Sequence, residues 1–99
     1  MPRYQIEYER AARRHIGRLA KRQQVALVDA IKRNLTWEPL VQTRNRKPLE
    51  DSELGGWELR VGDIRAYYDV SAEEQIVWIL AVGIKVGDLV SIDNKLVRP

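Results

Sequence analysis

Arginine and lysine are the residues whose number and type point most clearly to chemistry in this chain. The 99 residues include 17 lysines and arginines against 14 acidic residues, and twelve of these cations are arginine. Arginine binds phosphate or carboxylate groups through a planar fork of N–H donors. The first 22 residues carry seven cations and two anions, whereas the last third of the chain is acidic. The sequence therefore favours a polyanion or an acidic protein as partner.

Several catalytic classes are excluded by what the chain lacks. It has no cysteine, which removes thiolate catalysis, disulfides and cysteine-ligated zinc, and His15 is its one histidine. No Walker loop, GxGxxG motif or nucleophile elbow is present. We therefore expect no metal and no small-molecule cofactor. A lone histidine in a predicted helix is more often a packing residue than a catalyst, and we assign His15 no chemistry.

Length and composition predict one globular domain over residues 1–99. Hydrophobic residues make up 44% of the chain and charged residues 31%, as in ordinary soluble proteins. No apolar run approaches the ~20 residues that a membrane span needs, and the N-terminal segment is charged, unlike a signal peptide. We expect a cytoplasmic protein with no membrane partner.

The spacing of apolar residues predicts a strand followed by two helices. Residues 4–8 alternate between apolar and polar, which is the period of a strand with one buried face. A basic amphipathic helix follows from residue 10, and a second amphipathic pattern runs over residues 23–35. The sequence permits one long helix over residues 10–35. We favour a helical hairpin that turns at the polar residues 21–24.

The second half of the chain predicts an antiparallel sheet. Residues 36–56 read as a loop outside the core, and strands follow at 57–61, 64–70 and 76–82 with short links between them. The third strand is almost continuously apolar, which predicts that both of its faces are covered and that Trp78 is buried. Two short strands flanking Asp93-Asn94 suggest a small C-terminal hairpin. The predicted fold is α+β in the order β-α-α-β-β-β, with the helical hairpin packed on the antiparallel sheet.

The most distinctive pattern is Leu59–Tyr68 (LRVGDIRAYY), followed further on by Val82–Lys85 (VGIK). It resembles the sheet core of the RelE/ParE toxin superfamily. Members of that superfamily carry a Leu-Arg-x-Gly-x-x-Arg-hydrophobic-x-Tyr strand pair and a valine-rich strand that ends in Val-Gly-x-Arg or Val-Gly-x-Lys. The order of elements agrees as well, so the resemblance covers nearly the whole chain. It implies a toxin of a type II toxin-antitoxin system with a cognate antitoxin as partner.

The resemblance also implies site residues for a metal-free ribonuclease, in which cations stabilise the charge on an RNA phosphate attacked by the adjacent 2′-hydroxyl. Arg65 falls where the family has its phosphate-binding arginine, and Lys85 falls on the basic residue at the strand end. Lys47 occupies the loop position of an acid/base residue. Glu58 is a candidate general base, since a carboxylate near cations can accept a proton. The candidate residues for additional phosphate binding are Arg60, Arg46 and Arg44.

The pattern departs from the family's best-known endonucleases in two places. Glu58 stands in the strand where those enzymes carry lysines, and the segment after Lys85 contains no tyrosine or histidine. Strand periodicity predicts that Tyr67 shares a face with Arg65, where it is the candidate to replace the missing acid, while Tyr68 points the opposite way. We favour a ribosome-dependent mRNA endonuclease, whose partners are the ribosome and mRNA. A DNA gyrase inhibitor without chemistry of its own, or a protein that only binds its antitoxin, remains open.

Overall fold

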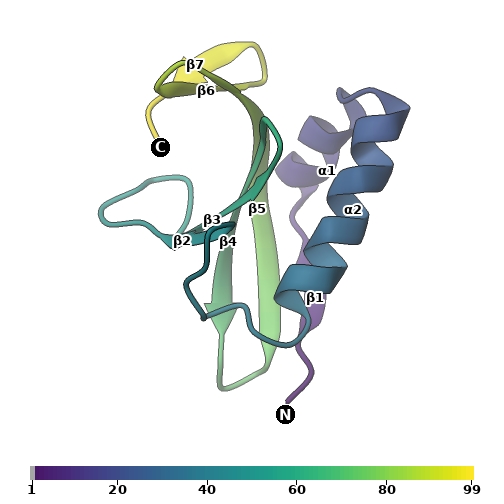
Figure 1. Ribbon diagram of the computed structural model, residues 1–99, viewed down its shortest axis with the longest axis vertical. Helices are drawn as coiled ribbons and strands as arrows, with labels where there is room; N and C mark the ends of the chain where they lie inside the picture. Colours follow the sequence, from purple (N-terminus) through teal and green to yellow (C-terminus); the bar gives the residue numbers. More distant parts are fainter. Residues whose placement is uncertain (1) are drawn as a thin grey trace.

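The computed structural model describes residues 2–99, which form an α+β domain of two helices and seven strands (Figure 1). In chain order the elements are β1 (Gln5–Tyr8), α1 (Arg10–Gly17), α2 (Lys21–Leu35), β2 (Arg46–Pro48), β3 (Trp57–Val61), β4 (Ile64–Ser71), β5 (Ile76–Val86), β6 (Leu89–Ile92) and β7 (Lys95–Val97). The predicted fold class and the predicted C-terminal hairpin are confirmed. The prediction that residues 36–56 are all loop is wrong at β2, a strand too short to show a period. Neither helix is long and apolar enough to cross a membrane.

The strands form a single mixed sheet in the order β2-β3-β4-β5-β6-β7. Neighbours along this order are antiparallel, which confirms the predicted sheet for these six strands. The remaining strand, β1, differs because it pairs with β5 in parallel, with Gln5 opposite Ile76 and Tyr8 opposite Ile79. A parallel pair needs a long connection, and both helices lie in the chain between these two strands.

The two helices form the expected hairpin and cover one face of the sheet (Figure 1). The turn between them lies at residues 18–20, so the predicted turn at residues 21–24 is wrong. Ala20 is extended, with φ −60° and ψ 149°, and its N–H donates to the side-chain oxygen of Gln23 over 3.0 Å. The polar residues that suggested a turn instead form the first helical turn of α2, where a glutamine can cap the helix start.

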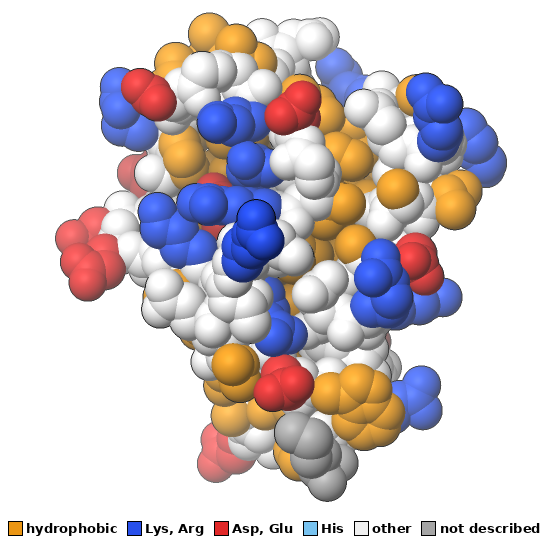
Figure 2. Space-filling view, viewed as in Figure 1, with side chains coloured by type: hydrophobic (Ala, Val, Ile, Leu, Met, Phe, Trp, Pro, Cys, Tyr) orange, Lys and Arg blue, Asp and Glu red, His pale blue; other side chains and the backbone are white. Residues whose placement is uncertain are grey.

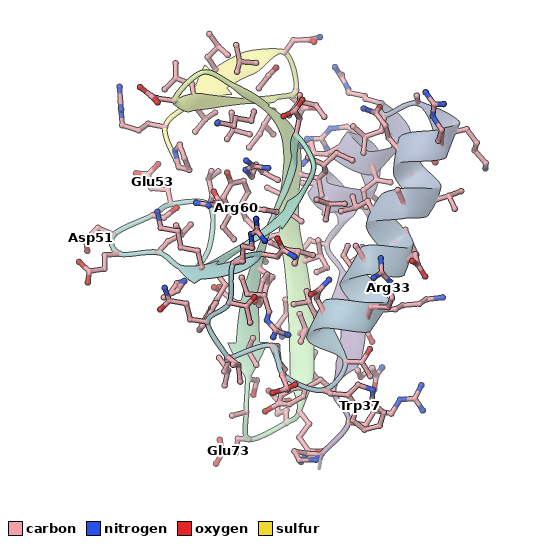
Figure 3. All side chains as sticks on the ribbon, in the orientation of Figure 1. Arg33, Trp37, Asp51, Glu53, Arg60 and Glu73 are labelled. Carbon is pink, nitrogen blue, oxygen red and sulfur yellow. The ribbon has the colours of Figure 1, made fainter. Side chains whose placement is uncertain are left out.

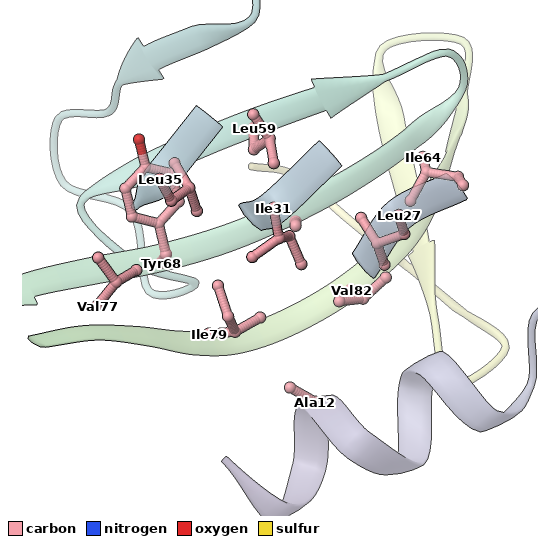
Figure 4. Close-up of a cluster of buried hydrophobic side chains, with 11 residues drawn as sticks. Ala12, Leu27, Ile31, Leu35, Leu59, Ile64, Tyr68, Val77, Ile79 and Val82 are labelled. Carbon is pink, nitrogen blue, oxygen red and sulfur yellow. The ribbon is translucent and has the colours of Figure 1, made fainter. Parts of the chain in front are cut away.

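The main core lies between α2 and the sheet (Figure 4). Leu27, Ile31 and Leu35 recur every four residues along α2, so they share one face, and all three are fully buried. Each such side chain contributes about 1.5–3 kcal/mol by leaving water. Tyr68 belongs to the same core, and its hydroxyl donates to the carbonyl oxygen of Pro39 over 2.8 Å. This placement confirms the face predicted for Tyr68.

A β-bulge in β5 decides which side chains reach the sheet face opposite the helices. The consecutive residues Tyr67–Tyr68 of β4 pair with Ala81 and Ile79, which leaves Leu80 without a residue opposite it. An extra residue of this kind inverts the alternation of side chains beyond it. Lys85 therefore lies on the face away from the helices. An unbroken strand would have turned it toward them.

Trp78 is not a core residue, and the prediction that both faces of β5 are covered is wrong at this point. It lies on the face away from the helices and is 36% exposed. Its neighbours across the sheet are Glu7 in β1 and Asp69 in β4. The helices cover the opposite face, so an apolar side chain at this position stays in contact with water.

Asp93 ties the C-terminal hairpin to α1. The two residues of the turn between β6 and β7 have φ of 52° and 64°, the left-handed conformation that a two-residue hairpin needs. The Asp93 carboxylate meets Arg14 at 2.8 Å, His15 Nε2 at 3.3 Å and Arg18 at 3.3 Å. His15 is buried, and its Nδ1 accepts the backbone N–H of Val82 in β5 over 3.1 Å. These contacts fix the hairpin beside the end of β5.

We expect Asp93→Asn to remove a pH-dependent part of the stability. The hydrogen bond from Arg14, together with the charges of Arg14 and Arg18, holds the pKa of Asp93 below its ordinary value of 3.8. A carboxyl group whose pKa is depressed by folding adds stability above the unfolded-state pKa and loses it as the pH falls through the folded-state pKa. Thermal unfolding should therefore show the wild type above the variant at neutral pH, with the difference closing below about pH 4. A difference that stays constant down to strong acid would contradict this role.

Candidate phosphate-binding cavity

Five of the seven predicted site residues line one open cavity of about 320 Å³ on the sheet face away from the helices. They come from four successive strands, and Figure 2 shows the lysine and arginine side chains gathered on this face below the C-terminal hairpin. The five residues are Lys47 of β2, Glu58 and Arg60 of β3, Arg65 of β4 and Lys85 of β5. The sheet therefore assembles most of the predicted set in one place.

The strand register explains this convergence. Lys47 lies directly opposite Glu58, and Arg60 lies directly opposite Arg65. Residues paired in this way have Cβ atoms about 4.5–5.5 Å apart, and like charges in such a pair destabilise the sheet. The opposed arginines are thus unfavourable by themselves, and an anion bound between them would relieve their repulsion.

Glu58 links Arg60 to Tyr67 beneath the cavity. Arg60 Nε donates to one Glu58 oxygen over 2.9 Å, and the Tyr67 hydroxyl donates to the other over 3.0 Å. Glu58 is 4% exposed and Tyr67 is fully buried, whereas the Arg60 side chain remains 40% exposed. Burial, followed by the charge and hydrogen bond of Glu58, raises the pKa of Tyr67 far above its ordinary value. The hydroxyl therefore keeps its proton and donates a hydrogen bond to Glu58.

This network bears on the two proton-transfer roles considered for Glu58 and Tyr67. Both oxygens of Glu58 are engaged, so the carboxylate is arranged to orient its neighbours more than to take a proton from a ligand. Tyr67 does lie on the face predicted for it, but its hydroxyl is buried and committed to Glu58. The geometry therefore does not favour Tyr67 as the replacement for the missing acid.

Arg65 is anchored at the rim of the cavity by the turn between β3 and β4. Its Nη1 donates to the carbonyl oxygens of Gly62 over 2.7 Å and Ile64 over 3.0 Å. Gly62 has φ 59°, a conformation that favours glycine, so the turn itself depends on this residue. The backbone N–H of Lys85 donates to Asp63 in the same turn over 2.8 Å. The Gly-x-x-Arg turn therefore brings the guanidinium of Arg65 and the end of β5 together.

Arg46 and Arg44 do not join the cavity. Arg46 pairs with Leu59, so its side chain lies on the helix side of β2, where it is 8% exposed and donates to the carbonyl oxygen of Asn34 in α2. A cation near the C-terminal end of a helix is favourable because the helix dipole is negative there. Arg44 is exposed and does not line the cavity. Successive side chains of β2 point to opposite faces of the sheet, so Arg46 and Lys47 lie on different sides. The prediction of a loop for this segment gave no reason to expect such alternation.

The cavity includes residues that the sequence analysis missed. Asp88, from the turn between β5 and β6, and Leu89, the first residue of β6, line its wall. The turn returns the chain over Lys85, which pairs with Val90. The sequence does contain a signal for this turn, because a Gly-Asp pair between two apolar segments is typical of a tight hairpin. In the structure Gly87 has φ 62°. In residues 2–99, no three histidine, aspartate or glutamate side chains gather as a metal site would need.

A sequence model described as the ParE toxin of the type II toxin-antitoxin system parDE matches residues 6–85. The chain belongs to this family. Its fold is also similar to one chain of the toxin-antitoxin complex RelBE2 from Mycobacterium tuberculosis, with a TM-score of 0.70 and 31% identity over 84% of this chain and 99% of that chain. No curated protein sequence is found to match. The resemblance to the RelE/ParE superfamily is confirmed, and the chain is a toxin of a type II toxin-antitoxin system. The matched residues contain all five predicted residues that line the cavity.

Proposed function

We propose that this toxin binds an RNA phosphate in the cavity and cleaves mRNA on the ribosome. The observation that carries the proposal is the convergence of four cations, Lys47, Arg60, Arg65 and Lys85, from four strands on one cavity. Like charges held together by a sheet favour an anionic ligand because they are already in place before it binds. A phosphodiester gains negative charge in its transition state, and preorganised donors stabilise that charge more than the ground state.

The proposed reaction is attack of an RNA 2′-hydroxyl on the adjacent phosphorus. The bond between O2′ and phosphorus forms while the bond to O5′ breaks, leaving a 2′,3′-cyclic phosphate and a 5′-hydroxyl. Arg60 and Arg65 bind the non-bridging oxygens, and Lys85 adds positive charge at the strand end. Lys47 donates a proton to the 5′-oxygen, and the 2′-hydroxyl proton passes to solvent because both Glu58 oxygens are engaged. The ribosome contributes by holding the mRNA in an attacking geometry.

The proposal includes a cognate antitoxin. RelBE2, the similar solved structure, is a toxin-antitoxin complex. An acidic antitoxin segment would complement the cations of the cavity or the exposed arginines of α1, which are Arg10, Arg13 and Arg14. Such a segment would also keep RNA from the cavity until it is removed. Because the ribosome is the proposed target, we place the toxin in the cytoplasm.

A second candidate function is inhibition of DNA gyrase by binding alone. The observation that favours it is the engagement of Glu58 and Tyr67, since the cavity then presents cations without a free carboxylate to accept the 2′-hydroxyl proton. In that case the same cations would bind a protein carboxylate or a DNA phosphate. The two candidate functions predict different first effects in a cell, which are loss of translation for the endonuclease and loss of DNA supercoiling for the gyrase inhibitor.

Induced expression with parallel pulse labelling distinguishes them. For an mRNA endonuclease we expect amino-acid incorporation to fall first while a reporter plasmid stays negatively supercoiled. Lys85→Ala should weaken this block, because it removes a cation from the cavity. Lys95→Ala is the matched control, since Lys95 is an exposed lysine of the C-terminal hairpin that does not line the cavity. Relaxation of the plasmid before any loss of translation would contradict the endonuclease and support gyrase inhibition.

A further inference from the structure

Tyr67 is the fully buried member of the network under the cavity, and the proposed reaction assigns it no role. It packs with Ala81, Val90 and Ile92 in a second cluster on the sheet face away from the helices. It does not line the cavity itself. Its hydroxyl donates a hydrogen bond to Glu58, which in turn accepts one from Arg60 Nε. Tyr67 can therefore affect a bound anion only through these two residues.

The geometry of the Glu58–Arg60 pair leaves part of the guanidinium available to a ligand. The contact with Glu58 uses Nε, so the edge that carries Nη1 and Nη2 is not used by it. A guanidinium held through Nε is restrained in direction, which lowers the entropy cost of binding an anion. The orientation of Glu58 therefore sets the orientation of Arg60.

We propose that Tyr67 is a positioning residue whose hydroxyl holds Glu58 in the orientation that presents Arg60 to an anion. This inference rests on the proposed function, because the RNA phosphate is the anion concerned. Without the hydroxyl, one oxygen of a nearly buried carboxylate would lose its donor, which is costly. Glu58 would then turn to another donor, and Lys47 lies directly opposite it in the neighbouring strand. A carboxylate turned toward Lys47 would no longer hold Arg60 through its Nε.

Tyr68 provides a matched control on the other face of the same strand. Like Tyr67 it is fully buried, and its hydroxyl donates one hydrogen bond, to Pro39 over 2.8 Å. Burial raises the pKa of both tyrosines well above its ordinary value. Substitution by phenylalanine removes one buried hydroxyl in each case and keeps the ring. The two variants should lose similar stability, and only Tyr67→Phe should affect the cavity.

The test is NMR of the arginine Nε–H groups, which reports on Arg60 without requiring activity. Arg33 is an internal reference because its Nε donates to Asp29 over 2.9 Å on α2, far from the labelled Arg60 in Figure 3. We expect Tyr67→Phe to shift the Arg60 signal and leave Arg33 unchanged, while Tyr68→Phe moves neither. Inorganic phosphate should bind about tenfold more weakly to Tyr67→Phe and with wild-type affinity to Tyr68→Phe.

A double-mutant cycle completes the test. In an Arg60→Ala background, Tyr67→Phe should cause no further loss of phosphate affinity, because the hydroxyl acts through Arg60. In the wild type, phosphate should shift the Arg60 signal without moving that of Arg33, a measurement that needs no variant. An unchanged Arg60 signal in Tyr67→Phe, or an equal loss of affinity with and without Arg60, would overturn the proposal. If phosphate binding responds as expected but mRNA stays intact, the positioning role stands and the endonuclease proposal fails.

Discussion

Replacing Arg65 with alanine is expected to lower the rate of mRNA cleavage by about 10²- to 10³-fold, the usual effect of removing one donor that stabilises transition-state charge. Arg65 is anchored by the carbonyl oxygens of Gly62 and Ile64 and lies in the cavity opposite Arg60. Its loss removes half of the opposed arginine pair. Single-turnover cleavage on stalled ribosome complexes measures the rate, and circular dichroism checks that the turn still folds.

Two further variants separate charge from geometry. Arg65→Lys keeps the charge without the planar fork, so we expect a rate between those of the wild type and Arg65→Ala. Arg33→Ala removes an arginine whose exposed pair with Asp29 contributes little to stability, and it should cleave at the wild-type rate. An Arg65→Ala protein that folds and cleaves as fast as the wild type would remove Arg65 from the site.

Gly83→Ala adds only a methyl group, yet it should lower the free energy of unfolding by about 3 kcal/mol or more. A Cβ at this position would lie 2.6 Å from Cγ1 of Ile92 and closer still to the carbonyl oxygen of Ser91. The carbonyl belongs to β6 and cannot move without separating β5 from β6. Separation would also displace Lys85, which pairs with Val90 in β6. The glycine of the Val-Gly-x-Lys motif is thus required by the close approach of two strands.

Gly17→Ala is the matched control for this prediction. Nothing lies within 4 Å of a Cβ built on Gly17, which is the last residue of α1. Alanine there should leave stability unchanged or raise it by about 0.5–1 kcal/mol, because glycine is entropically unfavourable in a helix. Urea unfolding of the two variants beside the wild type measures both effects. Equal stability of Gly83→Ala and the wild type would show that β6 can yield without cost.

Local patterns were sufficient to predict most of the fold. Alternation over residues 4–8 and the apolar spacing through residues 23–35 predicted β1 and α2, because each pattern indicates a single buried face. The spacing did not identify that face fully, because Val25, which belongs to it, is 62% exposed. The opposite faces of Tyr67 and Tyr68 followed from strand geometry in the same way. The sequence could not predict that β1 pairs with β5 in parallel, because parallel and antiparallel pairing bury the same face of so short a strand.

The features that the sequence could not predict depend on contacts that form only when the strands and helices come together. The bulge at Leu80 lies in an apolar run without alternation, so the sequence carries no sign of where the faces exchange. The burial of Arg46 depends on the end of α2, twelve residues earlier in the chain. The engagement of Glu58 depends on Arg60 in its own strand and on Tyr67 across the sheet. Residue type suggested a general base, and only the fold shows that both oxygens of Glu58 accept hydrogen bonds.

Primer extension on a defined mRNA in a purified translation system is the most direct test of the proposal that the cationic cavity cleaves mRNA on the ribosome. We expect discrete new 5′ ends within the translated region, formed only when ribosomes are translating. Arg65→Ala, run beside the wild type, should give full-length mRNA. Intact mRNA with the wild-type toxin, under conditions in which it stops growth, would rule out the endonuclease and direct attention to gyrase.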